Sequence, residues 1–150
     1  MNYTWMALLV LVIFYGIYFT KMYLQKRQGI RTHQIGRRKE KGLHTVEIFM
    51  SVATFAIVIV QLISVMAGWN NMPQSIRYAG FGTGIVGDLI FGISVHCMRD
   101  SWRAGIPDQD KTKLVTEGIY AYSRNPAFLG FDLQYIGILL MYCNVLLAVF

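Results

Sequence analysis

The segment best suited to chemistry is a polar stretch that ends at Arg124, Asn125 and Pro126. Asn is a common helix-capping residue and Pro is favoured at the first helical position, so the sequence predicts that a helix begins at Pro126. The Arg124 guanidinium would then stand beside the positive end of that helix, where a carboxylate or phosphate is stabilised. Arg124 is therefore predicted either to bind an anionic group or to act as a basic anchor at a membrane surface.

A second candidate is an acidic residue within the apolar window 78–98. Asp88 lies near the middle of this window. An ionised carboxylate there would cost at least ~2.5 kcal/mol in a membrane, so such residues tend to face a cavity or a partner. Asp88 shares one helical face with small residues; the face comprises Gly80, Gly84, Gly87, Asp88 and Phe91. Small residues let either another helix or a ligand come close, and the sequence leaves both possibilities open.

The elements that must position these residues are membrane-spanning helices. Of the 150 residues, 55% are hydrophobic and 15% are charged, which is too apolar for an ordinary soluble domain of this length. A helical span needs roughly 20 mostly apolar residues. Four windows qualify, namely 2–20, 46–67, 78–98 and 127–150. We therefore predict an all-α, polytopic transmembrane bundle of about four spans.

Two polar interruptions refine this prediction. The turn 69–73 is short, so the second and third spans are expected to be antiparallel neighbours. The last window is expected to divide into a span ending near Tyr142, a turn at Asn144 and the start of a fifth span.

The basic residues predict the orientation of the bundle. Most of them gather in two predicted loops, 21–45 and 99–126, whereas only Arg77 lies in the loop between the second and third spans. The positive-inside rule then puts both long loops in the cytoplasm and the N-terminus outside. This topology explains the net charge of +6 without a nucleic-acid partner, although the first basic loop could also hold anionic lipid headgroups. Cys97 and Cys143 form no CxxC motif, and no metal site is predicted.

The loop sequence resembles that of a known family. Isoprenylcysteine carboxyl methyltransferases and their bacterial relatives carry a stretch of the form LVT-x-GxY, followed by R-(N/H)-P-x-(Y/F)-x-G. The matching residues here are Trp102, Arg103, Gly105, Ile106, Leu114, Val115, Thr116, Gly118, Ile119, Tyr120, Ser123, Arg124, Asn125, Pro126, Phe128, Leu129 and Gly130. The third span also resembles, more loosely, the glycine-rich GFxGTxxGD region of phosphatidylethanolamine N-methyltransferases, through Gly80, Phe81, Gly82, Gly84, Gly87 and Asp88.

The resemblance implies a methyltransferase that uses S-adenosyl-L-methionine. The cofactor-binding residues it implies are Gly82, Gly84, Leu114, Val115, Gly118, Tyr120, Arg124, Asn125 and Pro126. The catalytic candidates are Asp88, as the base that an amine acceptor would require, and Arg124, as the counter-charge for the cofactor carboxylate. The aromatic surfaces that could meet the cofactor belong to Trp102, Tyr120, Tyr122 and Phe128. The implied acceptor is a lipophilic molecule, either a prenylated cysteine carboxylate or a lipid headgroup, bound beside membrane lipids.

The end of the chain departs from the family pattern. Family members usually continue with another span and a cytoplasmic helix that carries an acidic pair, whereas this sequence ends at Phe150 within an apolar run. We therefore expect a single integral membrane methyltransferase-like domain over residues 1–150 that lacks its C-terminal part.

Two other functions compete with this interpretation. One is a four-span glutathione-dependent membrane enzyme, although the arginine- and histidine-rich signature of that class is missing from the second predicted span. The other is a non-catalytic membrane scaffold or accessory subunit that would use the glycine face to bind a partner helix.

Overall fold

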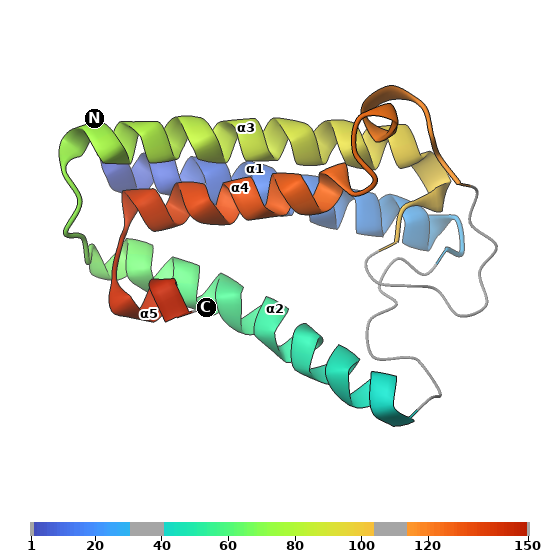
Figure 1. Ribbon diagram of the computed structural model, residues 1–150, viewed down its shortest axis with the longest axis horizontal. Coiled ribbons are helices and arrows are strands. Elements are labelled where there is room, and N and C mark those ends of the chain that lie inside the picture. The colour runs from blue at the N-terminus through green and yellow to red at the C-terminus, as the bar shows by residue number, and fades with distance from the viewer. Residues whose placement is uncertain (1, 31–40, 104–113, 150) are drawn as a thin grey trace.

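The computed structural model describes residues 2–30, 41–103 and 114–149, without the side chains of residues 41–44, 47 and 50. This part of the chain is all-α, as predicted (Figure 1). Its helices are α1 (Tyr3–Arg27), α2 (Lys41–Ala67), α3 (Gln74–Met98), α4 (Pro126–Met141) and α5 (Val145–Val149), and its 3₁₀ turns are η1 (Arg99–Ser101) and η2 (Gly118–Ala121).

The predicted helix boundaries are confirmed at the two ends of α4. Pro126 is the first residue of α4 and Asn125 occupies the N-cap position, although the Asn125 side chain makes no capping hydrogen bond. The predicted break near Asn144 separates α4 from α5, and the Asn144 side chain accepts a hydrogen bond from the Leu147 amide at 2.9 Å. The predicted first loop, 21–45, is too long because α1 continues to Arg27 and α2 begins at Lys41.

α3 and α4 form the closest helix pair, and glycines on both helices make this possible. A Cβ on Gly87 would lie 2.5 Å from the Gln134 backbone nitrogen and 2.7 Å from the Gly130 oxygen. At the next contact along the pair, a Cβ on Gly137 would lie 2.6 Å from the Gly84 nitrogen. The two backbones therefore touch without intervening side chains, so packing accounts for the glycine face of α3.

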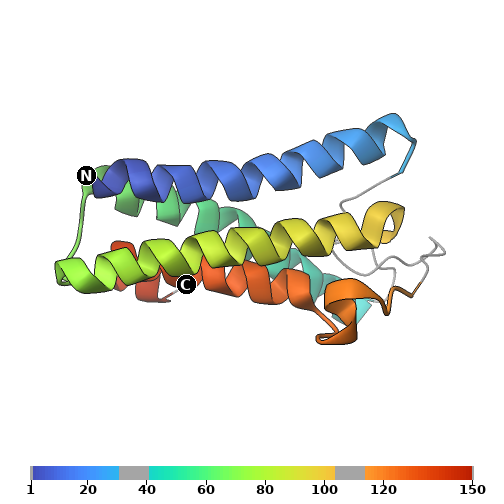
Figure 2. The ribbon, with the colours of Figure 1, turned by 90° about the horizontal axis from the view of Figure 1, so that it is seen from above.

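α1 covers the other side of this pair. Val10 of α1 packs against Gly84, whose added Cβ would lie 3.0 Å from the valine side chain. One helical turn further along, the ring centroids of Phe14 and Phe91 are 4.3 Å apart. Figure 2 shows α1 and α3 running in the same direction, as the alternation of helices requires.

The position of α2 differs from the prediction. α2 packs on α5 and α1 rather than on α3, and Figure 1 shows it diverging from the other helices toward its N-terminal end. Its contact with α1 includes a hydrogen bond from the Tyr15 hydroxyl to Gln61 Oε1 at 3.5 Å. α2 and α3 run in opposite directions, as predicted, but the expectation that they are neighbours is wrong, because the α4 glycines occupy the close-packing face of α3.

Arg77 contacts two other helices at one end of the bundle. Its Nε donates a hydrogen bond to the Met141 carbonyl at 3.0 Å, where α4 ends. Its guanidinium carbon also lies 3.7 Å from the Tyr3 ring centroid and 5.0 Å from that of Tyr142. A single side chain of α3 therefore connects the start of α1 to the end of α4.

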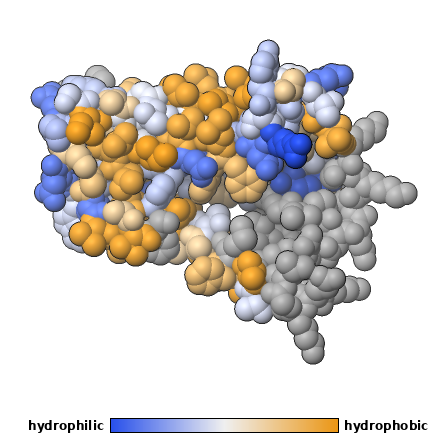
Figure 3. All heavy atoms as spheres, in the orientation of Figure 1, coloured by the Kyte–Doolittle hydropathy of each residue, from blue (hydrophilic) through white to orange (hydrophobic). Residues whose placement is uncertain are grey.

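The surface of the helices suits a membrane. Within the described chain, Tyr3–Arg27 and Gln74–Ser101 are long and apolar enough to cross a bilayer, and Ser51–Ala67 and Pro126–Met141 are shorter apolar helices. Large apolar side chains such as Val12, Phe55 and Leu89 are exposed on these helices. Figure 3 shows apolar side chains over much of one face of the molecule. By length and composition, the described chain therefore has two candidate membrane spans and an apolar surface that suits a bilayer, and four spans remain a prediction.

Candidate functional site

The predicted loop residues lie where α3 ends and α4 begins. The turn η2 packs on the last part of α3, and a Cβ on Gly118 would lie 3.2 Å from Cys97 Sγ. Gly118 also has a φ of +63°, which only glycine adopts without strain. Tyr120 is half-buried beside Cys97, and burial, followed by the Cys97 thiol, raises the pKa of the Tyr120 hydroxyl. This hydroxyl therefore stays protonated and can donate a hydrogen bond.

The segment that leaves α3 is held by α1. Trp102 is 5% exposed, and its ring lies edge-on to Tyr18 and Phe91, with centroids 5.7 and 6.1 Å away. The Gln25 side chain donates a buried hydrogen bond of 3.1 Å to the Trp102 carbonyl. Trp102 therefore anchors the segment after η1, and the expectation that its ring offers a surface to a cofactor is not met.

The N-terminal end of α4, which carries the positive end of the helix dipole, is exposed to solvent. Arg124 and Asn125 are exposed, whereas Pro126 is buried. The Asn125 side chain does not cap the helix, so it leaves the first backbone N–H groups of α4 available. The backbone N–H of Asn125 donates a hydrogen bond to Ser123 Oγ at 3.3 Å, which fixes the chain just before the helix. Together, Arg124 and the helix start can bind an anionic group.

The proposed site residues fall into two groups. Seven of them lie together at this end of the bundle: Leu114, Val115, Gly118, Tyr120, Arg124, Asn125 and Pro126. Gly82 and Gly84 lie much deeper along α3, at least about 20 Å from its last residue by the rise of 1.5 Å per residue. Gly82 is exposed with nothing near it, and Gly84 is covered by Val10 and Gly137. The structure does not bring these glycines to the loop.

Asp88 is buried in the interior of the bundle. It is 2% exposed, and neither carboxylate oxygen has a hydrogen-bond partner among the described residues. Gln134 of α4 is equally buried, and its amide atoms also have no hydrogen-bond partner in this part of the chain. Gly87, the neighbour of Asp88, contacts Gly130, which follows the start of α4 at Pro126 by four residues, or about 6 Å along the helix. Burial, and not distance along the bundle, therefore separates the Asp88 carboxylate from the open end.

This fold and this loop define an α-helical membrane protein with a polar site at one end of its helices. Residues 81–150 match the model of the isoprenylcysteine carboxyl methyltransferase (ICMT) family, which confirms the resemblance to that family over this part of the chain. Every site residue proposed from the sequence lies within the matched segment. Comparison with curated proteins and comparison with solved structures gave no significant match.

The structure shows two features that the sequence analysis did not single out. Asp132 is an exposed acidic residue within α4, and its place in an apolar window was a signal that could have drawn attention to it. A cleft of about 660 Å³ also lies between α1 and α3. It contains none of the site residues proposed from the sequence, and its lining residues are Gly16, Ile17, Thr20, Lys21, Leu24, Gly92, Val95, His96, Arg99 and Asp100. Because two distant segments form the cleft, no local motif marks it.

Proposed function

We propose that this protein is an S-adenosyl-L-methionine-dependent methyltransferase that acts on a lipophilic acceptor at the membrane surface. The observation that carries the proposal is the family match over residues 81–150, which includes the loop and both ends of the α3–α4 connection. A scaffold function has lost its main support, because the glycine face that would bind a partner helix is occupied by α4 of the same chain.

The loop residues fit one end of the cofactor well. Arg124 is exposed beside backbone N–H groups that no side chain caps, an arrangement that suits the carboxylate of the cofactor's amino acid group. The Tyr120 hydroxyl can donate a hydrogen bond, and Tyr122, which is 93% exposed, offers an aromatic face. When bound, the cofactor supplies a methyl group on a sulfonium centre. We assign no role in binding it to Gly82 or Gly84, because both are remote from these residues.

The placement of Asp88 favours one kind of acceptor. Transfer to an amine requires a base, whereas a carboxylate is already nucleophilic when ionised. Asp88 is 2% exposed, so an acceptor bound at the exposed loop residues does not contact its carboxylate. We therefore propose a carboxylate acceptor of the prenylated cysteine type, for which the protein mainly holds the two reactants in contact and keeps water away.

Calorimetry with S-adenosylhomocysteine tests the cofactor half of the proposal. The full chain, purified in detergent or in lipid nanodiscs, should bind this product with measurable heat. The acceptor half is tested by methyl transfer to N-acetyl-S-farnesylcysteine, with phosphatidylethanolamine as the comparison acceptor. Absence of binding by a folded sample would reject the cofactor, and methylation of the amine alone would reject the carboxylate acceptor.

A further inference from the structure

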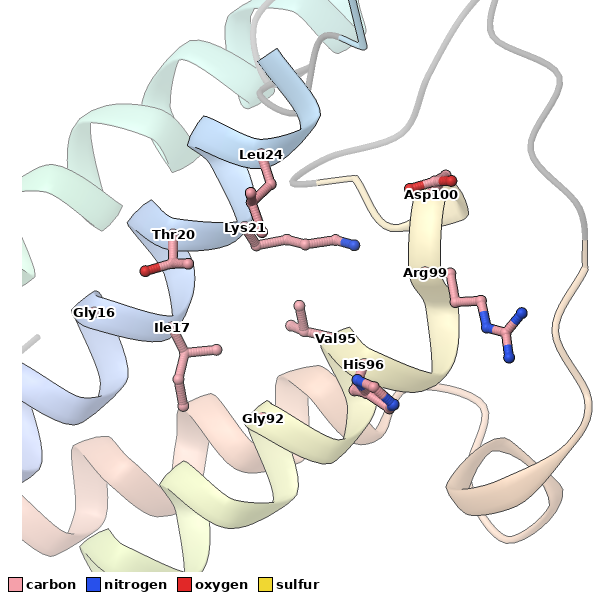
Figure 4. Close-up of a pocket in the computed structure, with 10 residues that line it drawn as sticks. All are labelled: Gly16, Ile17, Thr20, Lys21, Leu24, Gly92, Val95, His96, Arg99 and Asp100. Carbon is pink, nitrogen blue, oxygen red and sulfur yellow. The ribbon is translucent and has the colours of Figure 1, made fainter. Parts of the chain in front are cut away.

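The cleft between α1 and α3 changes in character along its length (Figure 4). Its inner end is formed by Gly16, Ile17 and Gly92, and its outer end by Leu24, Arg99 and Asp100. The outer end is at the end of the bundle where α1 and α3 both terminate. Apolar surface therefore leads into a polar, charged rim at the depth expected for the membrane interface.

The rim carries more positive than negative charge. Lys21 and Arg99 are cationic and His96 is a possible hydrogen-bond donor, whereas Asp100 is the acidic residue of the lining. Figure 4 shows the Lys21 side chain extended across the cleft from α1 toward the end of α3. Arg99 and His96 are exposed; Figure 4 shows the Arg99 guanidinium directed away from Lys21, so this exposed side chain must rotate to meet a ligand in the cleft. Such a rim favours a phosphate group.

The inner end is open because two of its residues have no side chain. A Cβ on Gly16 would meet nothing within 4 Å, and a Cβ on Gly92 would lie 3.3 Å from the Ile17 side chain. Ile17 and Val95 supply apolar walls between these glycines and the rim. A volume of about 660 Å³ is in the range of small-molecule sites and can hold a headgroup with the first part of an acyl chain.

We propose that this cleft binds an anionic phospholipid. The phosphate lies against Lys21, His96 and Arg99, and the start of an acyl chain follows Ile17 and Val95 toward Gly16. The charge of the rim and the apolar inner end match the two halves of such a lipid. The site does not depend on methyl transfer, since it shares no residue with the loop site proposed above.

Lipid retention by the full chain tests this proposal. The protein is purified in detergent, given phosphatidylglycerol or phosphatidylcholine, and examined by native mass spectrometry and thermal unfolding. We expect selective retention of phosphatidylglycerol. The double variant Lys21→Gln with Arg99→Gln should bind it more weakly by on the order of ten- to thirty-fold, because each basic residue near an anionic surface contributes about one kcal/mol. Equal retention of both lipids would overturn the proposal.

Two further variants separate the lipid from simpler explanations. Lys26→Gln with Arg27→Gln removes the same charge from the exposed end of α1 outside the cleft, and it should keep phosphatidylglycerol selectivity. An equal loss in this control would show general surface attraction instead. Gly16→Leu fills the inner end without touching the protein at its Cβ, and it should reduce lipid retention at unchanged charge. Unchanged retention would reject the acyl-chain position.

Inorganic phosphate distinguishes a lipid from a free anion. In detergent without added lipid, phosphate at millimolar concentration should raise the unfolding temperature less than phosphatidylglycerol does, because it cannot use the apolar inner end of the cleft. Equal protection by phosphate would assign the cleft to a small anion and reject the lipid.

Discussion

Arg124 is exposed at the start of α4, where its charge adds to the positive end of the helix. If it binds the cofactor carboxylate, Arg124→Gln should lower affinity for S-adenosylhomocysteine by about ten-fold or more, since a hydrogen bond to a charged group contributes about 1.5–3 kcal/mol. An exposed side chain contributes little to folding, so the unfolding temperature should change slightly. Calorimetry and thermal unfolding measure the two effects separately.

The matched variant for this position is Arg124→Lys. It keeps the charge but loses the planar fork of the guanidinium, so its affinity should fall between those of the wild type and the glutamine variant. If the two variants bind as tightly as the wild type, Arg124 is only a basic anchor at the membrane surface.

A substitution of Asp88 tests whether this buried carboxylate takes part in methyl transfer. Its carboxylate is buried without a hydrogen-bond partner in the described chain, so Asp88→Asn, which has nearly the same shape, should fold with unchanged or higher thermal stability. Methylation of a carboxylate acceptor should also persist, because the buried Asp88 side chain does not contact an acceptor at the exposed loop residues. Loss of methyl transfer by a stably folded Asp88→Asn protein would instead make the residue part of the reaction.

At the level of the helices, the α3–α4 contact depends on the absence of side chains. Gly87→Ala puts a Cβ 2.5 Å from the Gln134 backbone nitrogen, so the helices must separate. We expect a loss of about 1–3 kcal/mol in the free energy of unfolding, as for other overpacked interiors. Unfolding in mixed detergent micelles measures this change.

Gly82→Ala is the control for this substitution. Gly82 is on the same helix, but an added Cβ would meet nothing within 4 Å. Alanine is the better helix former, so this variant should be neutral or more stable by up to about 1 kcal/mol. If the two variants have equal effects, the contact between the glycines does not determine the stability of the pair.

Helix ends could be predicted from the sequence, whereas contacts between helices could not. The start of α4 at Pro126 and the break at Asn144 depend on local residue types, so both were predictable. The partner of the glycine face was not, because Gly87 meets Gly130 only once α3 and α4 are brought together across a long loop. The burial of Trp102 and the cleft around Lys21 likewise depend on contacts with distant residues.

The whole molecule has a predicted orientation that remains to be measured. Lys26, Arg103 and Arg124 lie at or near one end of the helices, and Arg77 lies near the other, as the alternation of spans requires. In a background with Cys97→Ser and Cys143→Ser, a membrane-impermeant maleimide should label Gln74→Cys on intact cells. Lys26→Cys should react only after the membrane is opened, because its end is predicted to be cytoplasmic. The reverse pattern would invert the topology.

The length of α4 has a consequence for the surrounding bilayer. Its 16 residues span about 24 Å, whereas the hydrocarbon core of a typical membrane is about 30 Å thick. The glycine contacts hold α4 against the longer α3, so α4 cannot adjust its tilt independently. This hydrophobic mismatch must be met by thinning of the lipid around α4 or by sinking Arg124 below the headgroups. The protein should therefore work best in bilayers of short-chain lipids, which bring the surface of the membrane down to the start of α4.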